Sequence, residues 1–222
     1  MRHLTTLLLT ALIICAGALI YPHTNLLAQG SNTKGSDTKA STAPRPEGLP
    51  LATFAGGCFW CLESEIKDLK GVKFTRAGYT GGSTDNPTYK QISNGRTGHA
   101  EAVQIAFDPG ETDYETLTRF FLTQGHNPTQ LNRQWVDSGT QYRSAIFYHN
   151  EDQKRIAQAL IAELTAAKHF DKPIVTQVVP AVTFWDAEEY HQNYYEKYEQ
   201  TNGYEHRRIK SKKQWKKSWM KK

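Results

Sequence analysis

Apolar residues along positions 51–198 recur with two spacings, and each spacing predicts a kind of secondary structure. Residues 51–56 form an apolar run that glycine closes, which is typical of a buried strand, whereas residues 59–69 repeat apolar side chains at helical intervals. The same criteria predict strands at 72–79, 100–107, 144–148 and 174–179, and helices at 89–93, 114–122, 151–168 and 187–198.

The order of these elements favours one fold class. It begins strand, helix, strand, strand and then mixes the two kinds of element without an internal repeat. That order is typical of an α+β fold rather than of a regularly alternating, doubly wound fold. We therefore predict a single domain with a mixed β-sheet, packed helices and a βαββ-type, ferredoxin-like core.

The first 50 residues carry a different pattern. Arg2 and His3 precede an apolar run at 4–20, as in a signal peptide, and the run is nearly long enough to span a bilayer. A stretch rich in Ser, Thr, Gly, Lys and Pro follows, with little that could pack. We predict a signal peptide or signal anchor at 1–28, a flexible linker at 29–50, a folded domain at 51–205 and a basic tail at 206–222. The protein is expected to be exported to the periplasm or cell envelope, either soluble or membrane-anchored.

The formal net charge of +5 comes from the end of the chain. Residues 207–222 contain nine Lys or Arg residues and no acid, so the rest of the chain is net negative. Trp215 and Trp219 lie among these cations, which fits an anchor on anionic lipid or another envelope polyanion and equally fits a solvated tail. A nucleic acid partner is not expected for an exported protein.

The use of cysteine points to chemistry. Cys15 lies in the targeting segment, so Cys58 and Cys61 are the cysteines of the folded region, and a pair three residues apart cannot staple a scaffold. Three interpretations are open: buried structural cysteines, a zinc site, and a redox site such as a thioredoxin-like motif. A zinc site lacks a second pair of cysteine ligands, and the spacing at a helix start favours redox chemistry.

Cys58 lies where the first strand passes into the first helix. Amides at a helix N-terminus are unpaired and carry partial positive charge, so we expect them to stabilise a thiolate and lower the pKa of Cys58. Gly56 and Gly57 let the backbone approach a ligand closely. Cys61 lies three residues on, on the same helix face, within reach of Cys58 for a disulfide.

Several motifs around and beyond these cysteines occur together in one family. They are Gly-Cys-Phe-Trp at 57–60 with Glu63, Gly-Tyr-Thr-Gly-Gly at 78–82, Asn-Pro-Thr-Tyr at 86–89, Gly-His-Ala-Glu-Ala-Val at 98–103, Gly-Thr-Gln-Tyr-Arg-Ser at 139–144 and Glu-Tyr-His-Gln at 189–192. In this set and order, the region resembles the A-type peptide-methionine sulfoxide reductases. The resemblance implies an enzyme that reduces methionine-S-sulfoxide, free or in proteins, and so repairs oxidised proteins, with 51–205 as its catalytic reductase domain.

The resemblance also implies a role for each site residue. Cys58 would attack the sulfoxide sulfur, and a proton donor must then meet the charge that develops on the oxygen. Glu101 occupies the acid position of the family. A carboxyl among apolar neighbours has a raised pKa, so it can be protonated at neutral pH and can donate that proton. Tyr89 and Tyr142 would donate hydrogen bonds to the sulfoxide oxygen, and Asp137 would order the site through hydrogen bonds.

Attack would leave Cys58 as a sulfenic acid. Cys61 would condense with it, and a thioredoxin-like partner would reduce the disulfide as an external thiol reductant. Phe59 and Trp60 would form the wall of the pocket that holds the methyl group of the substrate. By resemblance, the enzyme takes the S epimer alone and needs no metal or flavin, and we expect a monomer.

Two features depart from the family pattern. Many members carry resolving cysteines near the C-terminus, and this chain has none, so Cys61 is the inferred resolving thiol and direct reduction by an external thiol is the alternative. Residues 134–137 read Gln-Trp-Val-Asp where the family usually has Gln-Gly-Asn-Asp. We expect Trp135 to narrow or extend the substrate groove.

Two other functions compete with this one. A thioredoxin-like disulfide oxidoreductase would exchange disulfides without reducing a sulfoxide, and would leave Glu101, Tyr89 and Tyr142 without a role. An envelope-binding module that uses the basic tail would depend on residues 206–222 rather than on the cysteines.

Overall fold

Six strands form one mixed sheet in the computed structural model, which describes residues 44–216 and 219. They are β1 (Leu51–Gly56), β2 (Val72–Thr80), β3 (Ala100–Phe107), β6 (Ser144–Tyr148), β7 (Gln177–Pro180) and β8 (Phe184–Asp186). Their order in the sheet is β7-β6-β1-β3-β2-β8. Strands β6 and β7 are parallel, and the other neighbours pair antiparallel.

The first strand lies in the interior of the sheet. It pairs with β3 in the register Phe54↔Val103 and with β6 in the register Gly56↔Ser144, so both of its edges are hydrogen-bonded. The order β6-β1-β3-β2, with β1 and β2 joined through a helix, is the predicted βαββ-type, ferredoxin-like core. The prediction of an α+β domain with a mixed sheet is confirmed.

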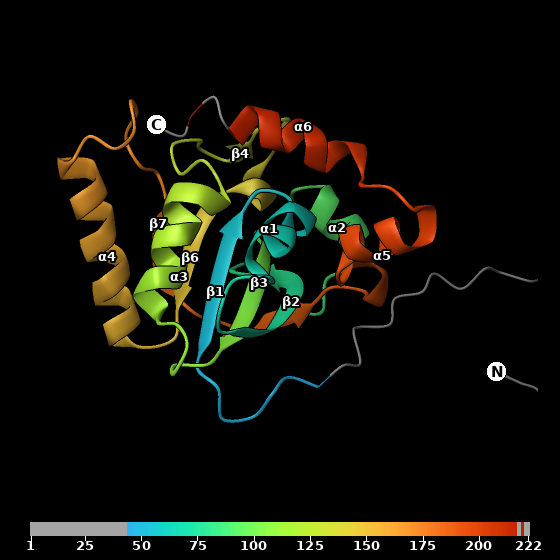
Figure 1. The fold of residues 1–222 in the computed structure, drawn as a ribbon, viewed down its shortest axis with the longest axis horizontal. Helices are drawn as coiled ribbons and strands as arrows, with labels where there is room; N and C mark the ends of the chain where they lie inside the picture. The colour runs from blue at the N-terminus through green and yellow to red at the C-terminus, as the bar shows by residue number, and fades with distance from the viewer. Residues whose placement is uncertain (1–43, 217–218, 220–222) are drawn as a thin grey trace, which may run out of the picture. The chain divides into compact units, whose positions relative to one another are not determined.

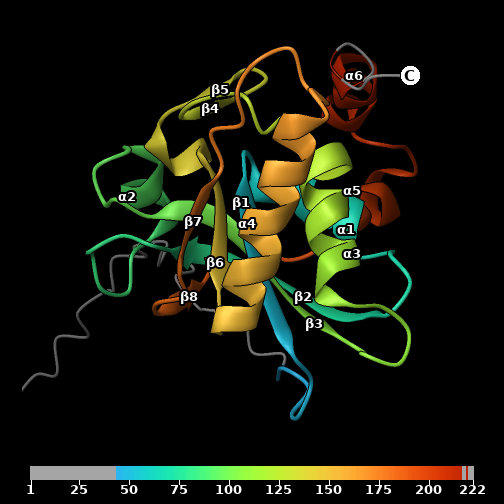
Figure 2. The same ribbon diagram turned by 90° about the vertical axis from the view of Figure 1, so that its left-hand side faces the viewer.

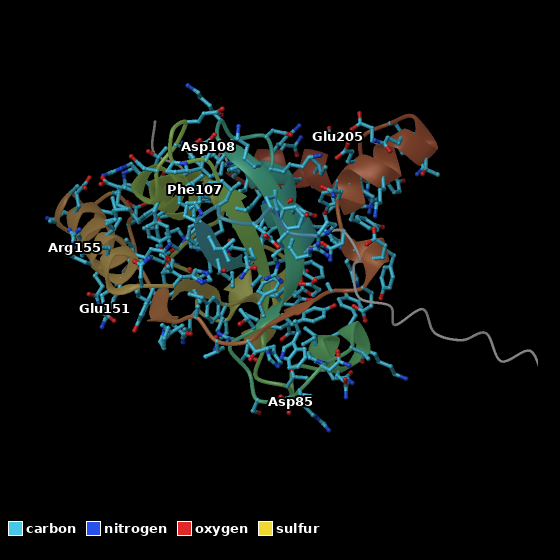
Figure 3. All side chains as sticks on the ribbon, turned by 90° about the horizontal axis from the view of Figure 1, so that it is seen from below. Asp85, Phe107, Asp108, Glu151, Arg155 and Glu205 are labelled. Carbon is cyan, nitrogen blue, oxygen red and sulfur yellow. The ribbon has the colours of Figure 1, made fainter. Side chains whose placement is uncertain are left out.

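Three helices pack on one face of the sheet, and in Figure 1 they lie in front of the strands or at their left. They are α1 (Phe59–Ile66), α3 (Tyr114–Phe120) and α4 (Glu151–Ala166). Each contributes apolar side chains to one core cluster, for example Leu62, Leu117 and Leu160. Glu151 and Arg155 lie on the outer side of α4, as Figure 3 shows, and both are exposed. The helices are therefore amphipathic, as their spacing predicted.

The opposite face carries a smaller cluster of alanines with Phe147, against which Phe184 and two other partly buried residues pack. Because both faces are covered, every residue of β3 is buried. Figure 2 shows the remaining elements around the sheet. They are α2 (Tyr89–Ser93), a π-helix (Phe121–Gly125), the hairpin of β4 (Arg133–Gln134) and β5 (Asp137–Ser138), two 3₁₀ helices (Thr140–Tyr142 and Glu189–His191), α5 (Tyr194–Asn202) and α6 (Arg207–Lys216).

The predicted helix over 187–198 is wrong in its first half. The amide side chain of Gln192 bonds to both the N–H and the carbonyl of Ala77 on β2, which ties this segment to the sheet. Asn193 then takes a left-handed backbone with φ 50°, and α5 begins after it. Side-chain hydrogen bonds therefore outweigh helical spacing in this segment.

The two ends of the chain compare differently with the sequence predictions. The predicted targeting segment and the linker up to residue 43 lie outside the described residues. Within 44–216 and 219, no helix is long and apolar enough to cross a membrane. Residues 207–216 differ from the predicted tail, since they form α6, which packs beside the end of β1 and the start of α1 (Figure 1).

Candidate active site

Cys58 lies at the junction of β1 and α1, where the sequence placed it. It is the N-cap residue of α1, and its carbonyl accepts from the N–H groups of Cys61 and Leu62. Gly57 before it has φ +86°, and a Cβ there would come within 2.5 Å of the side chain of Gln134. Glycine is therefore required at 57 both by its backbone conformation and by the close packing of the hairpin.

The two cysteines form one buried pair of free thiols. Cys58 is 8% exposed and Cys61 is 5% exposed, and both pack in one cluster with Tyr195. The interaction between the two thiols lowers the pKa of Cys61 to about 5 and raises the pKa of Cys58, which burial raises further. Tyr195 hydroxyl, 3.3 Å from Sγ of Cys61, stabilises the same thiolate. The resting charge therefore lies on Cys61.

This finding corrects the expected lowering of the Cys58 pKa. The helix start is present, but its first amide is occupied, because the N–H of Phe59 donates to Oε2 of Glu101 at 3.1 Å. The groups that stabilise a thiolate surround Cys61 instead. Cys58 is a thiol, because the neighbouring Cys61 and burial raise its pKa.

Glu101 lies on β3, behind the nucleophile, and is 2% exposed. Its pKa is raised to about 8, mainly by burial and also by the nearby carboxylate of Asp137, against the opposing effects of the bond from Phe59 and the charge of Arg208. The side chain is therefore mostly protonated at neutral pH, and can donate a proton next to Cys58.

Two tyrosines share this environment. Tyr89 begins α2, and its N–H donates to Oε1 of Glu188 at 2.9 Å. Tyr142 ends a 3₁₀ helix beside the β4–β5 hairpin. Burial raises the pKa of Tyr89 to about 12 and that of Tyr142 as well, and both values also respond to Glu101, Asp137 and Cys58. Both phenols are protonated donors, and the structure brings all five predicted catalytic side chains into one site.

Aromatic side chains surround the start of α1. Phe59 is fully buried and packs against the rings of Tyr89 and His191. Trp60 donates from Nε1 to Nδ1 of His191 at 3.0 Å and stacks on Tyr194 with ring centroids 3.8 Å apart. Burial lowers the pKa of His191 to about 4, so its ring is neutral and can accept from Trp60.

The helix α6 closes the site, and the sequence interpretation missed it. Arg208 forms an ion pair with Asp137, Lys212 donates to the carbonyl of Cys61 at 3.2 Å, and Ile209 packs against the cysteine pair. The signal for an inward-facing stripe was the spacing of Arg208, Lys212 and Lys216, which repeat every four residues and share one helix face.

Trp135 packs on this helix. Its ring lies 5.7 Å from the guanidinium of Arg208 and 6.3 Å from the ring of Trp215. It has φ 54°, a left-handed conformation that favours the glycine found at this position in the resembling family. Trp135, which stands where the resembling family usually has glycine, therefore contacts α6 in this structure.

These groups supply a consistent set of chemical functions. A thiol, an adjacent thiolate, a protonated carboxyl and two phenol donors meet beside an aromatic wall, which suits attack on a polar S–O bond with protonation of the oxygen. Among residues 44–216 and 219, no group of three or more His, Cys, Asp or Glu side chains could hold a metal ion.

The comparisons with known proteins agree on one family. The family model described as "Peptide methionine sulfoxide reductase" matches residues 51–222. A peptide methionine sulfoxide reductase MsrA of Acidobacterium capsulatum is 58% identical over 149 residues, which cover 67% of this chain and 95% of that protein. The MsrA of Deinococcus radiodurans is 45% identical over 174 residues, 78% of this chain and 81% of that protein. Among solved structures, reduced Mxr1 of Saccharomyces cerevisiae superposes with a TM-score of 0.66 at 32% identity, covering 75% of this chain and 94% of that one.

Proposed function

Since this chain belongs to the family of peptide methionine sulfoxide reductases, we propose that it reduces methionine-S-sulfoxide, free or in proteins, with Cys58 as its nucleophile. The observation that supports this most directly is the pairing of Cys58 with a protonated acid. Glu101 is buried, has a pKa near 8 and is bonded to the residue next to the nucleophile.

The first step oxidises Cys58. Its sulfur attacks the sulfoxide sulfur, and its proton passes to the neighbouring Cys61 thiolate. Glu101 donates a proton to the oxygen while Tyr89 and Tyr142 hold it. This attack joins the sulfur of Cys58 to the substrate sulfur. The protonated oxygen then passes to the sulfur of Cys58 as the S–O bond of the substrate and the bond between the two sulfurs break, so methionine leaves reduced by two electrons and Cys58 is left as a sulfenic acid. Asp137 orders the site, and Phe59 and Trp60 bound the space for the methyl group.

The second step regenerates the nucleophile. Cys61 loses its proton again, since the ammonium of Lys212 and the hydroxyl of Tyr195 also lower its pKa, and its thiolate attacks the sulfenic sulfur of Cys58. An S–S bond forms and hydroxide leaves as water after protonation. A separate thioredoxin-like reductant then reduces the disulfide of this chain by thiol–disulfide exchange.

A stereochemical assay tests the proposal. The full chain, reduced with dithiothreitol, is incubated with a racemic aryl methyl sulfoxide, and chiral chromatography follows each enantiomer. We expect loss of the S form alone, abolished in Cys58→Ser. Consumption of neither enantiomer by the folded, reduced chain would leave disulfide exchange as the better explanation of the two cysteines.

We further propose that the protein is exported and acts in the periplasm or envelope as a monomer. The basic and apolar pattern of residues 1–28 supports export. Contact with a membrane would come from this segment, since Arg208 and Lys212 of the basic region face the site. Fractionation of cells that express the full chain, followed by N-terminal sequencing, tests both export and cleavage.

A further inference from the structure

Lys212 differs from other cations of α6 in its surroundings. Its side chain is 8% exposed, against 62% for its neighbour Lys213. Its Nζ donates to the carbonyl oxygen of Cys61 at 3.2 Å and lies 3.9 Å from Glu65. Glu65 makes its shorter contact, 2.7 Å, with Lys216. A lysine is rarely buried without an anionic partner, and the closest polar contact of Lys212 is to the residue that carries the resting thiolate.

Charged and titratable groups act on Cys61 from several elements. They are Cys58 before α1, Glu101 of β3, Tyr195 of α5, and Arg208 and Lys212 of α6, while Glu65 of α1 faces Lys212. Both cations in this set come from α6. After the interaction with Cys58, the ammonium of Lys212 is the strongest group that lowers the pKa of Cys61.

We propose that Lys212 is a positioning residue for the regeneration of Cys58, because its buried ammonium keeps the negative charge on the sulfur of Cys61. The proposal rests on the function proposed above and concerns its second step alone. In that step the Cys61 thiolate gives two electrons to the sulfenic sulfur of Cys58, the S–S bond forms, and the S–O bond breaks. Hydroxide leaves and takes a proton from Glu101 or from water.

The placement of this charge suits a chain whose resolving thiol is three residues from its nucleophile. Cys58 and Cys61 lie on one helix and need no large movement to meet. What limits their reaction is the fraction of Cys61 that is deprotonated, since the thiolate is the attacking form. A fixed cation at the backbone of Cys61 raises that fraction at acidic pH.

A single-turnover experiment separates the two steps. The full chain carries Cys15→Ser, so that thiol counts refer to Cys58 and Cys61. Without an external thiol, it is mixed with a peptide containing methionine-S-sulfoxide and quenched at intervals. Methionine release reports the first step, and mass spectrometry with dimedone trapping reports conversion of sulfenic acid to disulfide. The variants are Lys212→Met, Lys212→Arg and, as a matched loss of charge on the exposed neighbour, Lys213→Met.

We expect Lys212→Met to move the midpoint of the pH profile for disulfide formation up by about one unit or more, since an opposite charge at this range shifts a pKa by about 1–3 units. At a pH below both midpoints, that shift slows disulfide formation by about tenfold or more, and the difference closes once the pH lies well above the midpoint of the variant, where Cys61 is deprotonated in both chains. Lys212→Arg should keep the wild-type midpoint, and Lys213→Met should match wild type throughout.

Other outcomes overturn the proposal. Equal slowing at every pH in Lys212→Met would show that the lysine only packs the helix, and an unchanged profile would show that its charge does not reach Cys61. Lys212→Met could fail to dock α6, and a direct titration covers that case. The thiolate absorbance of Cys61 is followed against pH in Cys58→Ser, with and without Lys212→Arg. A midpoint that rises when Arg replaces Lys212 contradicts the charge role. If the wild-type chain releases no methionine at all, the proposed function fails instead.

Discussion

The backbone N–H of Phe59 donates a hydrogen bond to Oε2 of Glu101 across 3.1 Å, and this bond joins the start of α1 to β3. The amide that follows the nucleophile thus holds the acid rather than the sulfur. The carboxyl of the acid is thereby held beside the backbone that carries the nucleophile.

Replacing Glu101 should remove the proton donor. We expect Glu101→Gln to slow methionine release in a single turnover by about 10²–10⁴-fold, the range of general acid catalysis. In the wild type, the same rate should fall as pH rises through about 8, because Glu101 holds its proton below that pKa and loses it above. Quench-flow between about pH 6 and 10 measures both. An alkaline fall that persists in Glu101→Gln would assign the titration to another group.

Replacing Cys61 should separate one turnover from many. Cys61→Ser is expected to release one methionine per chain and then to accumulate Cys58 sulfenic acid, since the neighbouring thiol that condenses with it is gone. With thioredoxin as reductant, steady turnover should fall by at least about tenfold. Dimedone labelling and a coupled thioredoxin assay measure these two effects. Undiminished turnover would favour direct reduction of the sulfenic acid by the external thiol.

Replacing Glu188 should loosen the start of α2. Its carboxylate accepts from the hydroxyl of Tyr79 at 2.8 Å and from the N–H of Tyr89 at 2.9 Å. Glu188→Ala leaves these donors unpaired in a buried region, so we expect the free energy of unfolding to fall by about 1–3 kcal/mol, with slower methionine release. Urea unfolding measures the first effect. Glu189→Ala, at the exposed neighbour, is the matched control and should change either quantity little.

Replacing Trp135 should weaken the packing of α6 without lowering the stability of the rest of the fold. Trp135→Gly removes a left-handed tryptophan, whose backbone strain costs roughly 1–2 kcal/mol, and also removes the ring that packs on Arg208 and Trp215. We expect faster amide exchange in residues 207–216, with a melting temperature equal to or above that of the wild type. Exchange in α4 is the internal control. Unchanged protection of 207–216 would mean that Trp135 does not hold the helix.

Local sequence patterns predicted much of the fold and part of the site. The apolar run of β1, the glycines after it and the spacing of α1 place Cys58 at a helix start, and each signal lies within a few residues of the feature it predicts. Glu101, Tyr89 and Tyr142 could be assigned from motifs, because their roles follow the family that the motifs resemble. The structure adds the burial that raises the pKa of each of these three side chains.

Contacts between distant segments could not be predicted from such patterns. A run of lysines reads as solvated by composition, and burial of Lys212 depends on Cys61, a residue 151 positions away. The pKa of Cys58 could not be predicted for the same reason. The helix start was visible in the sequence, but its first N–H, that of Phe59, donates to Glu101 on β3. The first half of the predicted helix over 187–198 does not form for the same reason, because Gln192 bonds to Ala77 of β2.

The bond between Lys212 and Cys61 also has a consequence for when the enzyme becomes competent during its own synthesis. The two residues are separated by 151 positions, so the nucleophile's helix leaves the ribosome long before the helix that completes its charge. Until the last turn of α6 has emerged and docked, Cys61 lacks its buried cation and Ile209 does not cover the thiols. A nascent or C-terminally clipped chain therefore has both cysteines without the cover of Ile209 and without the cation of Lys212. Both are in place once α6 has docked.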